Sequence, residues 1–90
     1  MTTCVISCKE LDTITDIHDA LAQALAFPDY YGKNLDALYD CLTARGTDTL
    51  VIFQDTSHIP VALEQYFRAV KTVFQDAAAS NSHLKAQFLE

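Results

Sequence analysis

Glycine and proline are scarce in this sequence, with 2 of each among 90 residues. Hydrophobic residues make up 50% of the chain and charged residues 20%. This composition excludes disordered and collagen-like proteins, which are poor in apolar residues or rich in glycine and proline. A chain of this length has too few residues for two separate cores, so we expect a single domain over residues 1–90.

Paired cysteines and long apolar runs are also missing. Cys4, Cys8 and Cys41 form no Cys-x-x-Cys pair and have no histidine at ligand spacing, so we expect reduced thiols and no metal site. No apolar run approaches the roughly 18 residues that a spanning helix needs, and no basic segment followed by an apolar stretch opens the sequence. These absences predict a cytoplasmic protein that does not bind membranes.

Basic residues are few between positions 10 and 40, where 7 acids accompany a single base, Lys33. In the rest of the chain 5 acids balance 5 bases, so the formal charge of -6 arises in that segment. A surface of this sign repels nucleic acid and anionic membranes, whereas it attracts a basic partner. The other interpretation of the acidic segment is that it keeps the protein soluble.

Apolar periodicity predicts two helices in the first half of the chain, after a short β-branched strand at residues 4–8. Thr13 and Asn34 are residue types that cap helix starts. The first helix has the inward residues Ile14, Ile17, Leu21 and Leu25, and the second has Leu35, Leu38 and Leu42. Residues 27–33 form a loop between them, in which Pro28 ends the helical conformation and Gly32 supplies a positive φ.

The second half of the chain predicts two more strands around a helical segment. The unbroken apolar run at residues 50–53 is typical of a central parallel strand covered on both faces. Helical spacing continues from Pro60 to about Ala79, compatible with one helix or with two joined by a bend. Residues 84–88 alternate like an edge strand. The predicted fold is α/β, with three or four helices packed on a three-stranded parallel sheet.

Asp36, Tyr39 and Asp40 share the face of the second helix that lies opposite its leucines. Asp36 lies near the positive end of the helix dipole, which stabilises it by about 0.3–1 kcal/mol. Asp40 lies beyond the first turn, and two like charges four residues apart cost roughly 0.2–0.5 kcal/mol. At least one of the adjacent Tyr30 and Tyr31 should be exposed. The pattern predicts a protein-binding surface, the alternative being that the tyrosines only cover the core.

The segment Asp16–Thr43, DIHDALAQALAFPDYYGKNLDALYDCLT, resembles the barstar family, intracellular inhibitors of a bacterial secreted ribonuclease. Tyr30–Thr43 is its most specific part. The resemblance implies a three-stranded parallel sheet with packed helices, and a free monomer that binds a small basic ribonuclease one-to-one, without nucleic acid. It also implies that an acidic helix and its adjoining loop enter the nuclease active site as a phosphate mimic. The implied contacts are Tyr30, Gly32, Asn34, Leu35, Asp36, Tyr39, Asp40 and Asp76.

The sequence departs from the family pattern at three positions. Tyr39 stands where the family often has tryptophan, which is a mild change. Arg45 replaces an aromatic residue after the helix, and Lys33 lies within the predicted binding loop. Both bases would repel a basic cleft if they faced it, so the departures suggest a different cognate nuclease.

Two other classes of function compete with inhibition. An enzyme would use Asp29, Asp36 and Asp40 as acid, base or hard-metal ligands, assisted by His18, His58 or His83. Those histidines are scattered and expected to be partly exposed, and no glycine-rich phosphate loop or nucleophile motif occurs. We therefore predict no catalytic residues and no cofactor. A barstar-like module that binds something other than a ribonuclease stays open, because the acidic face serves both.

Overall fold

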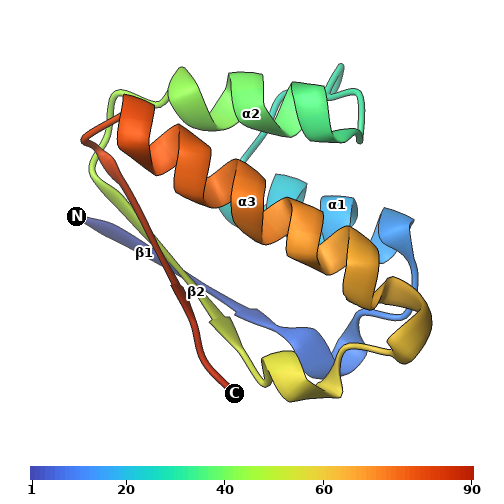
Figure 1. Ribbon diagram of the computed structural model, residues 1–90. Coiled ribbons are helices and arrows are strands. Elements are labelled where there is room, and N and C mark those ends of the chain that lie inside the picture. The colour runs from blue at the N-terminus through green and yellow to red at the C-terminus, as the bar shows by residue number, and fades with distance from the viewer.

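The computed structural model describes residues 1–90 and contains a three-stranded parallel sheet in the order β1-β2-β3. The strands are β1 (Thr2–Ser7), β2 (Thr49–Gln54) and β3 (Leu84–Phe88). The helices are α1 (Ile14–Leu25), α2 (Leu35–Thr43) and α3 (Glu64–Ser80), as Figure 1 shows. Short 3-10 turns lie at Cys8–Glu10, Thr56–His58 and Val61–Leu63. The α/β fold predicted from the sequence is confirmed.

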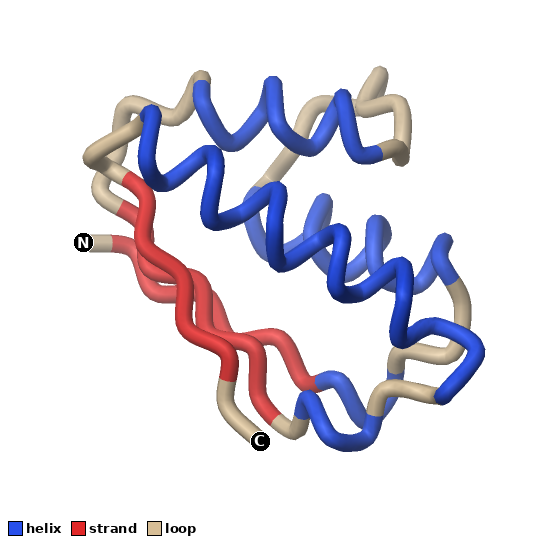
Figure 2. Tube along the Cα trace, viewed as in Figure 1, coloured by secondary structure: helices blue, strands red, loops and turns tan.

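The helices α1, α2 and α3 lie on one face of the sheet (Figure 2). Right-handed crossovers that advance in one direction across a parallel sheet place their helices on the same side, and the order β1-β2-β3 advances in this way. The other face therefore has no helix over it. Leu50 and Ile52 of β2 are partly exposed there, and the neighbouring Val5 of β1 is 53% exposed. The expectation that the middle strand is covered on both faces was wrong.

The core lies between the sheet and the helices, with Phe53 of β2 near its centre. Its ring stacks on Phe88 of β3, with centroids 4.9 Å apart, and meets Phe67 and Phe74 of α3 edge-on. Ile17, Leu21 and Leu25 of α1 and Leu38 and Leu42 of α2 are buried as predicted. Ile14 was predicted to face inward but is exposed, because it is the first residue of α1 and lies at the margin of the core.

The ends of the first two helices are held by the residues that the sequence indicated. Thr13 Oγ1 accepts a hydrogen bond from the Asp16 N–H, and the Asp16 carboxylate accepts one from the Thr13 N–H. Asn34 Oδ1 accepts a 2.7 Å hydrogen bond from the Ala37 N–H at the start of α2. Both predicted caps are confirmed, so the direction of α2 is set by local chemistry.

The loop between α1 and α2 reverses at different residues from the predicted one. The left-handed positions are Ala26, which ends α1 with a φ of 55°, and Lys33, with a φ of 52°, while Gly32 has no positive φ. The prediction for Gly32 was therefore wrong. A Cβ at Gly32 would lie 3.1 Å from Asn34 Nδ2, so this glycine leaves room for the residue that caps α2.

The segment that the sequence left undecided is one helix. Pro60 precedes the Val61–Leu63 turn, and α3 then continues without a break from Glu64 to Ser80. None of the helices has the length and apolar character needed to span a bilayer. The cysteines are unbonded as predicted: Cys4 and Cys8 are buried and Cys41 is partly buried.

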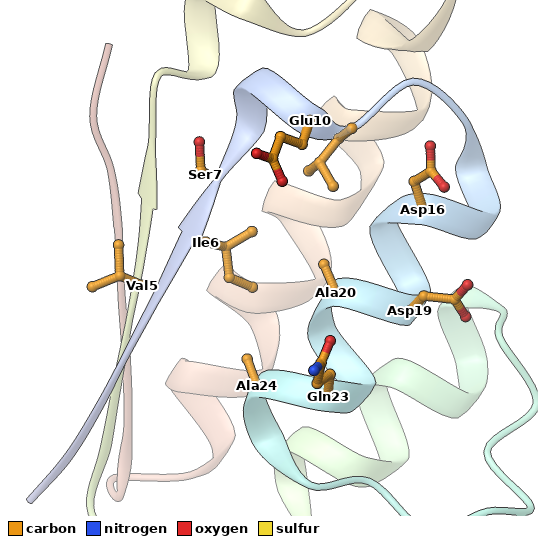
Figure 3. A pocket seen from close by; sticks show the side chains of 10 residues that line it. Val5, Ile6, Ser7, Glu10, Asp16, Asp19, Ala20, Gln23 and Ala24 are labelled. Atoms are coloured by element: carbon orange, nitrogen blue, oxygen red, sulfur yellow. The ribbon is translucent and has the colours of Figure 1, made fainter.

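A hollow of about 430 Å³ lies between β1 and α1 (Figure 3). Two of its acidic side chains already have partners within the chain. The Asp16 carboxylate accepts hydrogen bonds from the Asp12 and Thr13 N–H groups, and Asp19 pairs with Lys33 at 2.8 Å. None of its lining residues belongs to α2 or to the loop before it.

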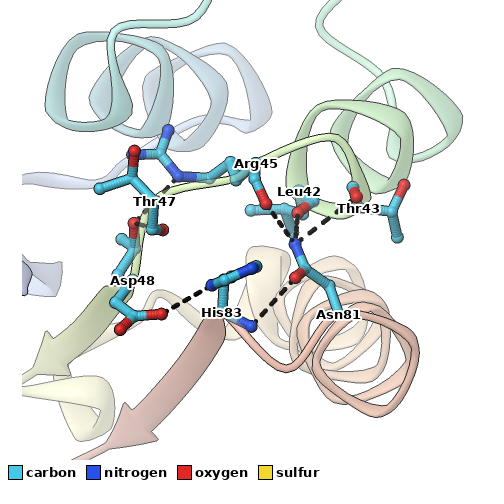
Figure 4. Close-up of polar contacts among 8 residues, drawn as sticks. Leu42, Thr43, Arg45, Thr47, Asp48, Asn81 and His83 are labelled. Carbon is cyan, nitrogen blue, oxygen red and sulfur yellow. Dashed lines mark hydrogen bonds and ion pairs between the residues drawn. The ribbon is translucent and has the colours of Figure 1, made fainter.

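Asn81 joins the end of α2 to the start of β3 (Figure 4). Its buried Nδ2 donates to the carbonyl oxygens of Leu42 and Arg45, at 2.9 and 3.0 Å. Its Oδ1 accepts a hydrogen bond from the His83 N–H at 3.0 Å. A single amide thus satisfies carbonyl groups that the end of a helix leaves without intrahelical partners.

Asn81→Ala should lower the free energy of unfolding by about 1–3 kcal/mol, because the buried Leu42 carbonyl and the partly buried Arg45 carbonyl lose their side-chain donor. Urea unfolding followed by circular dichroism measures the change. Ser82→Ala, at the exposed neighbour, should change stability by less than about 0.5 kcal/mol. Equal losses in the two variants would contradict the role given to Asn81.

Candidate protein-binding surface

Helix α2 has a buried side and a charged outer side. Leu38 and Leu42 are fully buried, which fixes the rotation of the helix about its axis. Asp36, Tyr39 and Asp40, together called the acidic face below, are exposed to solvent as predicted. Tyr39 is 36% exposed, and its hydroxyl lies 3.3 Å from Ser80 Oγ of α3. The Tyr39 side chain therefore extends toward α3. In sequence, Tyr39 lies between Asp36 and Asp40.

The carboxylates of the acidic face have no basic partner within this chain. The ion pairs of the structure join Lys33 to Asp19 and His83 to Asp48, at 2.8 and 2.7 Å. Asp36 and Asp40 are one helical turn apart, a spacing of about 5–6 Å between Cβ atoms. Two unpaired negative charges are thus held side by side on a rigid helix.

The loop before α2 exposes one of its two tyrosines, as predicted. Tyr30 is 88% exposed, whereas Tyr31 is 8% exposed and packs on Phe27 with ring centroids 4.8 Å apart. Tyr30 and Asp40 line the same shallow hollow of about 350 Å³. Tyr30 and Asp40, which are ten positions apart in sequence, therefore border one depression.

The remaining predicted site residues surround this surface. Gly32 and Asn34 are exposed in the loop and at the start of α2, and Leu35 is partly buried beside them. Asp76 is exposed on α3, one turn before the Ser80 that Tyr39 contacts. The structure thus places Asp76 on the helix that packs against α2, on the side toward Tyr39.

The two bases that depart from the family pattern are bound within the chain. Arg45 is partly buried and donates from Nε to Thr49 Oγ1 and from Nη1 to the Leu25 carbonyl oxygen, at 3.1 and 2.9 Å. It nevertheless lines the hollow that Tyr30 and Asp40 border. Lys33 turns toward α1, where it pairs with Asp19. Arg45 is therefore a positive group that borders the same hollow as Tyr30 and Asp40.

His18 lies in the interior rather than at the helix margin. It is fully buried, with Nδ1 2.6 Å from the Tyr31 hydroxyl and Nε2 2.6 Å from the Tyr66 hydroxyl of α3. The expectation of partial exposure was wrong for this residue, because two hydroxyls satisfy both ring nitrogens and permit burial. His18 also keeps helical spacing with Ile14, Leu21 and Leu25, a signal that could have revealed it. His58 and His83 are exposed.

Protein stability should fall as the pH decreases through about 6.5 because of His18. Burial lowers the pKa of His18 below its ordinary value of 6.5. The unfolded chain then binds more protons than the folded one in this range, so the stability present above pH 6.5 is lost as the pH falls toward the lowered pKa. Urea unfolding between pH 8 and pH 5 measures this slope.

His58→Gln provides the matched control, because His58 is an exposed histidine on a short turn. It should leave the slope nearly unchanged, whereas His18→Gln should flatten it. An unaltered slope in His18→Gln would show that another group titrates.

The fold and this surface define a small α/β protein in which the helices cover one face of a parallel sheet, and α2 exposes the acidic face to solvent. No cluster of three or more His, Cys, Asp or Glu side chains is placed to hold a metal ion. The sequence profile of the family described as "Barstar (barnase inhibitor)" matches residues 1–89. The chain belongs to the barstar family, which confirms the resemblance drawn from Asp16–Thr43.

One relative matches part of the chain closely. A stretch of 39 residues is 54% identical to the protein named "Putative ribonuclease inhibitor YrdF" of Bacillus subtilis (strain 168). The match covers 43% of this chain and 43% of the length of that relative.

Proposed function

We propose that this protein inhibits a small basic ribonuclease by covering its active site with the acidic face and the adjoining loop. The observation that carries the proposal is the pair of exposed carboxylates, Asp36 and Asp40, that no base of the chain neutralises. The family description and the name of the Bacillus relative support the same function. The proposed contacts are Tyr30, Gly32, Asn34, Leu35, Asp36, Tyr39, Asp40 and Asp76.

The chemistry of a ribonuclease cleft suits such a surface. A cleft that binds RNA carries arginine, lysine and histidine side chains to hold phosphates. Carboxylates accept the same charge-assisted hydrogen bonds from these groups as phosphate oxygens do. Asp36 and Asp40 would therefore take the places of phosphates, while Tyr30 and Tyr39 supply the aromatic contact area that protein interfaces favour.

The scaffold supports tight binding because the surface is already ordered. The buried leucines of α2 and the Asn34 cap hold the carboxylates in place, so little conformational entropy is lost on association. The net charge of -6 also raises the rate of encounter with a positively charged enzyme. We further propose that the protein is monomeric when free, binds its target one-to-one in the cytoplasm, and has no catalytic activity of its own.

A titration tests the proposal. Purified protein is added to a small basic guanyl-preferring ribonuclease, and RNA cleavage is followed at low and at moderate salt. We expect cleavage to end at one equivalent of protein. If several such enzymes stay fully active, the acidic face serves a partner that is not a ribonuclease. Turnover of RNA by the protein alone would instead indicate an enzyme.

A further inference from the structure

The loop before α2 is held to the rest of the protein largely through one buried side chain, Tyr31. Within the loop the Tyr31 N–H donates to the Pro28 carbonyl oxygen at 2.9 Å. The polar contact that anchors the loop to the interior joins the Tyr31 hydroxyl to His18 Nδ1, at 2.6 Å. The Lys33–Asp19 pair also crosses to α1, but both side chains are about half exposed, and such pairs contribute little.

His18 continues this connection to the opposite side of the core. Its Nε2 lies 2.6 Å from the Tyr66 hydroxyl of α3, so three hydrogen-bonding groups link the loop, α1 and α3. A neutral imidazole has one N–H donor and one bare nitrogen, so one tyrosine accepts from the ring and the other donates to it. Burial raises the pKa of both hydroxyls, which keeps them protonated. No buried side-chain nitrogen or oxygen is left without a partner.

Tyr31 and Tyr30 are consecutive in the loop, so the position of one constrains the backbone of the other. Tyr31 is buried in the core, whereas Tyr30 is exposed and borders the same hollow as Asp40. A loop released from His18 would lose this arrangement while α2 kept its own cap at Asn34.

We infer that His18 is a positioning residue for the partner-binding surface, holding the Tyr31 hydroxyl so that the loop presents Tyr30 beside Asp40. The role in binding rests on the proposed function, whereas the order of the loop can be measured in the free protein.

Two amide substitutions separate the two bonds of His18. Asparagine places its amide near the position of Nδ1, and glutamine reaches the position of Nε2. His18→Asn therefore keeps a partner for Tyr31 and loses the one for Tyr66, and His18→Gln does the reverse. Tyr31→Phe and Tyr66→Phe remove the corresponding hydroxyls one at a time and serve as matched variants.

The first measurement is amide hydrogen exchange of residues 29–33 in the free protein, compared with that of β2. We expect exchange in the loop to accelerate about fivefold to a hundredfold in His18→Gln and Tyr31→Phe, with β2 changing less. In His18→Asn and Tyr66→Phe, exchange in the loop should change by no more than exchange in β2. If exchange in the loop and in β2 changes by the same factor in every variant, the positioning role is overturned. If an amide variant does not fold, the two phenylalanine variants still decide.

The second measurement is the dissociation constant of the complex with the ribonuclease. It should rise about fivefold or more in His18→Gln and Tyr31→Phe, and His18→Asn should restore it toward the wild-type value. If the loop responds as expected but the wild-type protein binds no ribonuclease, the proposed function fails and the positioning role stands. Unchanged affinity with a loosened loop would overturn the link to binding.

Discussion

Asp40→Ala should weaken ribonuclease inhibition by at least about a hundredfold. In the proposed complex the Asp40 carboxylate is buried against the basic groups of the cleft. Removing one member of a buried ion pair costs roughly 3–5 kcal/mol, because the other charge stays desolvated without a partner. Each 1.4 kcal/mol corresponds to a factor of about ten in affinity. Inhibition constants from RNA cleavage at about 0.15 M salt measure the effect, since distant charges are screened there.

Asp12→Ala is the matched control, because Asp12 is exposed before α1 and its carboxylate has no hydrogen-bonding or ion-pair partner in the chain. Asp12→Ala removes the same charge, so it should slightly slow association with the enzyme at low salt. Its inhibition constant should stay within a few-fold of the wild-type value. Equal losses from Asp12→Ala and Asp40→Ala would mean that overall charge, rather than the acidic face, binds the enzyme.

Asp40→Ala should weaken inhibition without lowering the stability of the folded protein. Removing one of two like charges a turn apart on α2 relieves a repulsion of roughly 0.2–0.5 kcal/mol. The folded protein should therefore be as stable as the wild type or slightly more so in urea. A large loss of stability would contradict the assignment of Asp40 to a surface that only an external partner neutralises.

Phe53→Ala should lower the free energy of unfolding by about 3–5 kcal/mol, the range for truncating a buried aromatic side chain. Phe53 is fully buried and touches three other phenylalanine rings, of which the nearest is 4.9 Å away between centroids. The surrounding α3 and β3 cannot close the cavity without losing their own packing. Since small domains are typically stable by about 5–15 kcal/mol, this substitution removes much of the margin. Urea unfolding measures it.

Val5→Ala provides the comparison within the same sheet. Val5 lies on β1, one strand from Phe53, but its side chain is exposed and points away from α1 (Figure 3). Its truncation should cost less than about 0.5 kcal/mol. Similar costs at Val5 and Phe53 would indicate that the open face is covered in solution. Among folded molecules, both variants should inhibit like the wild type.

The helix starts and the acidic face could be read from the sequence because they depend on near neighbours. Thr13 and Asn34 act on N–H groups three residues away, and Asp36, Tyr39 and Asp40 share a face by helical spacing alone. The strands were recognisable from short apolar runs, although β1 begins two residues earlier than the predicted strand and ends at Ser7. These features need only the local geometry of the backbone.

Other features depended on contacts between distant segments. The burial of His18 requires hydroxyls 13 and 48 residues further along the chain, and Arg45 is bound by Leu25 and Thr49. The open sheet face follows from the order in which the strands pair, which a run such as residues 50–53 does not encode. Spacing along the chain thus determined which side chains lie on the acidic face, and the tertiary structure alone decided which charges stay unpaired. The reason is that burial and pairing are properties of surfaces that meet only when the chain has folded.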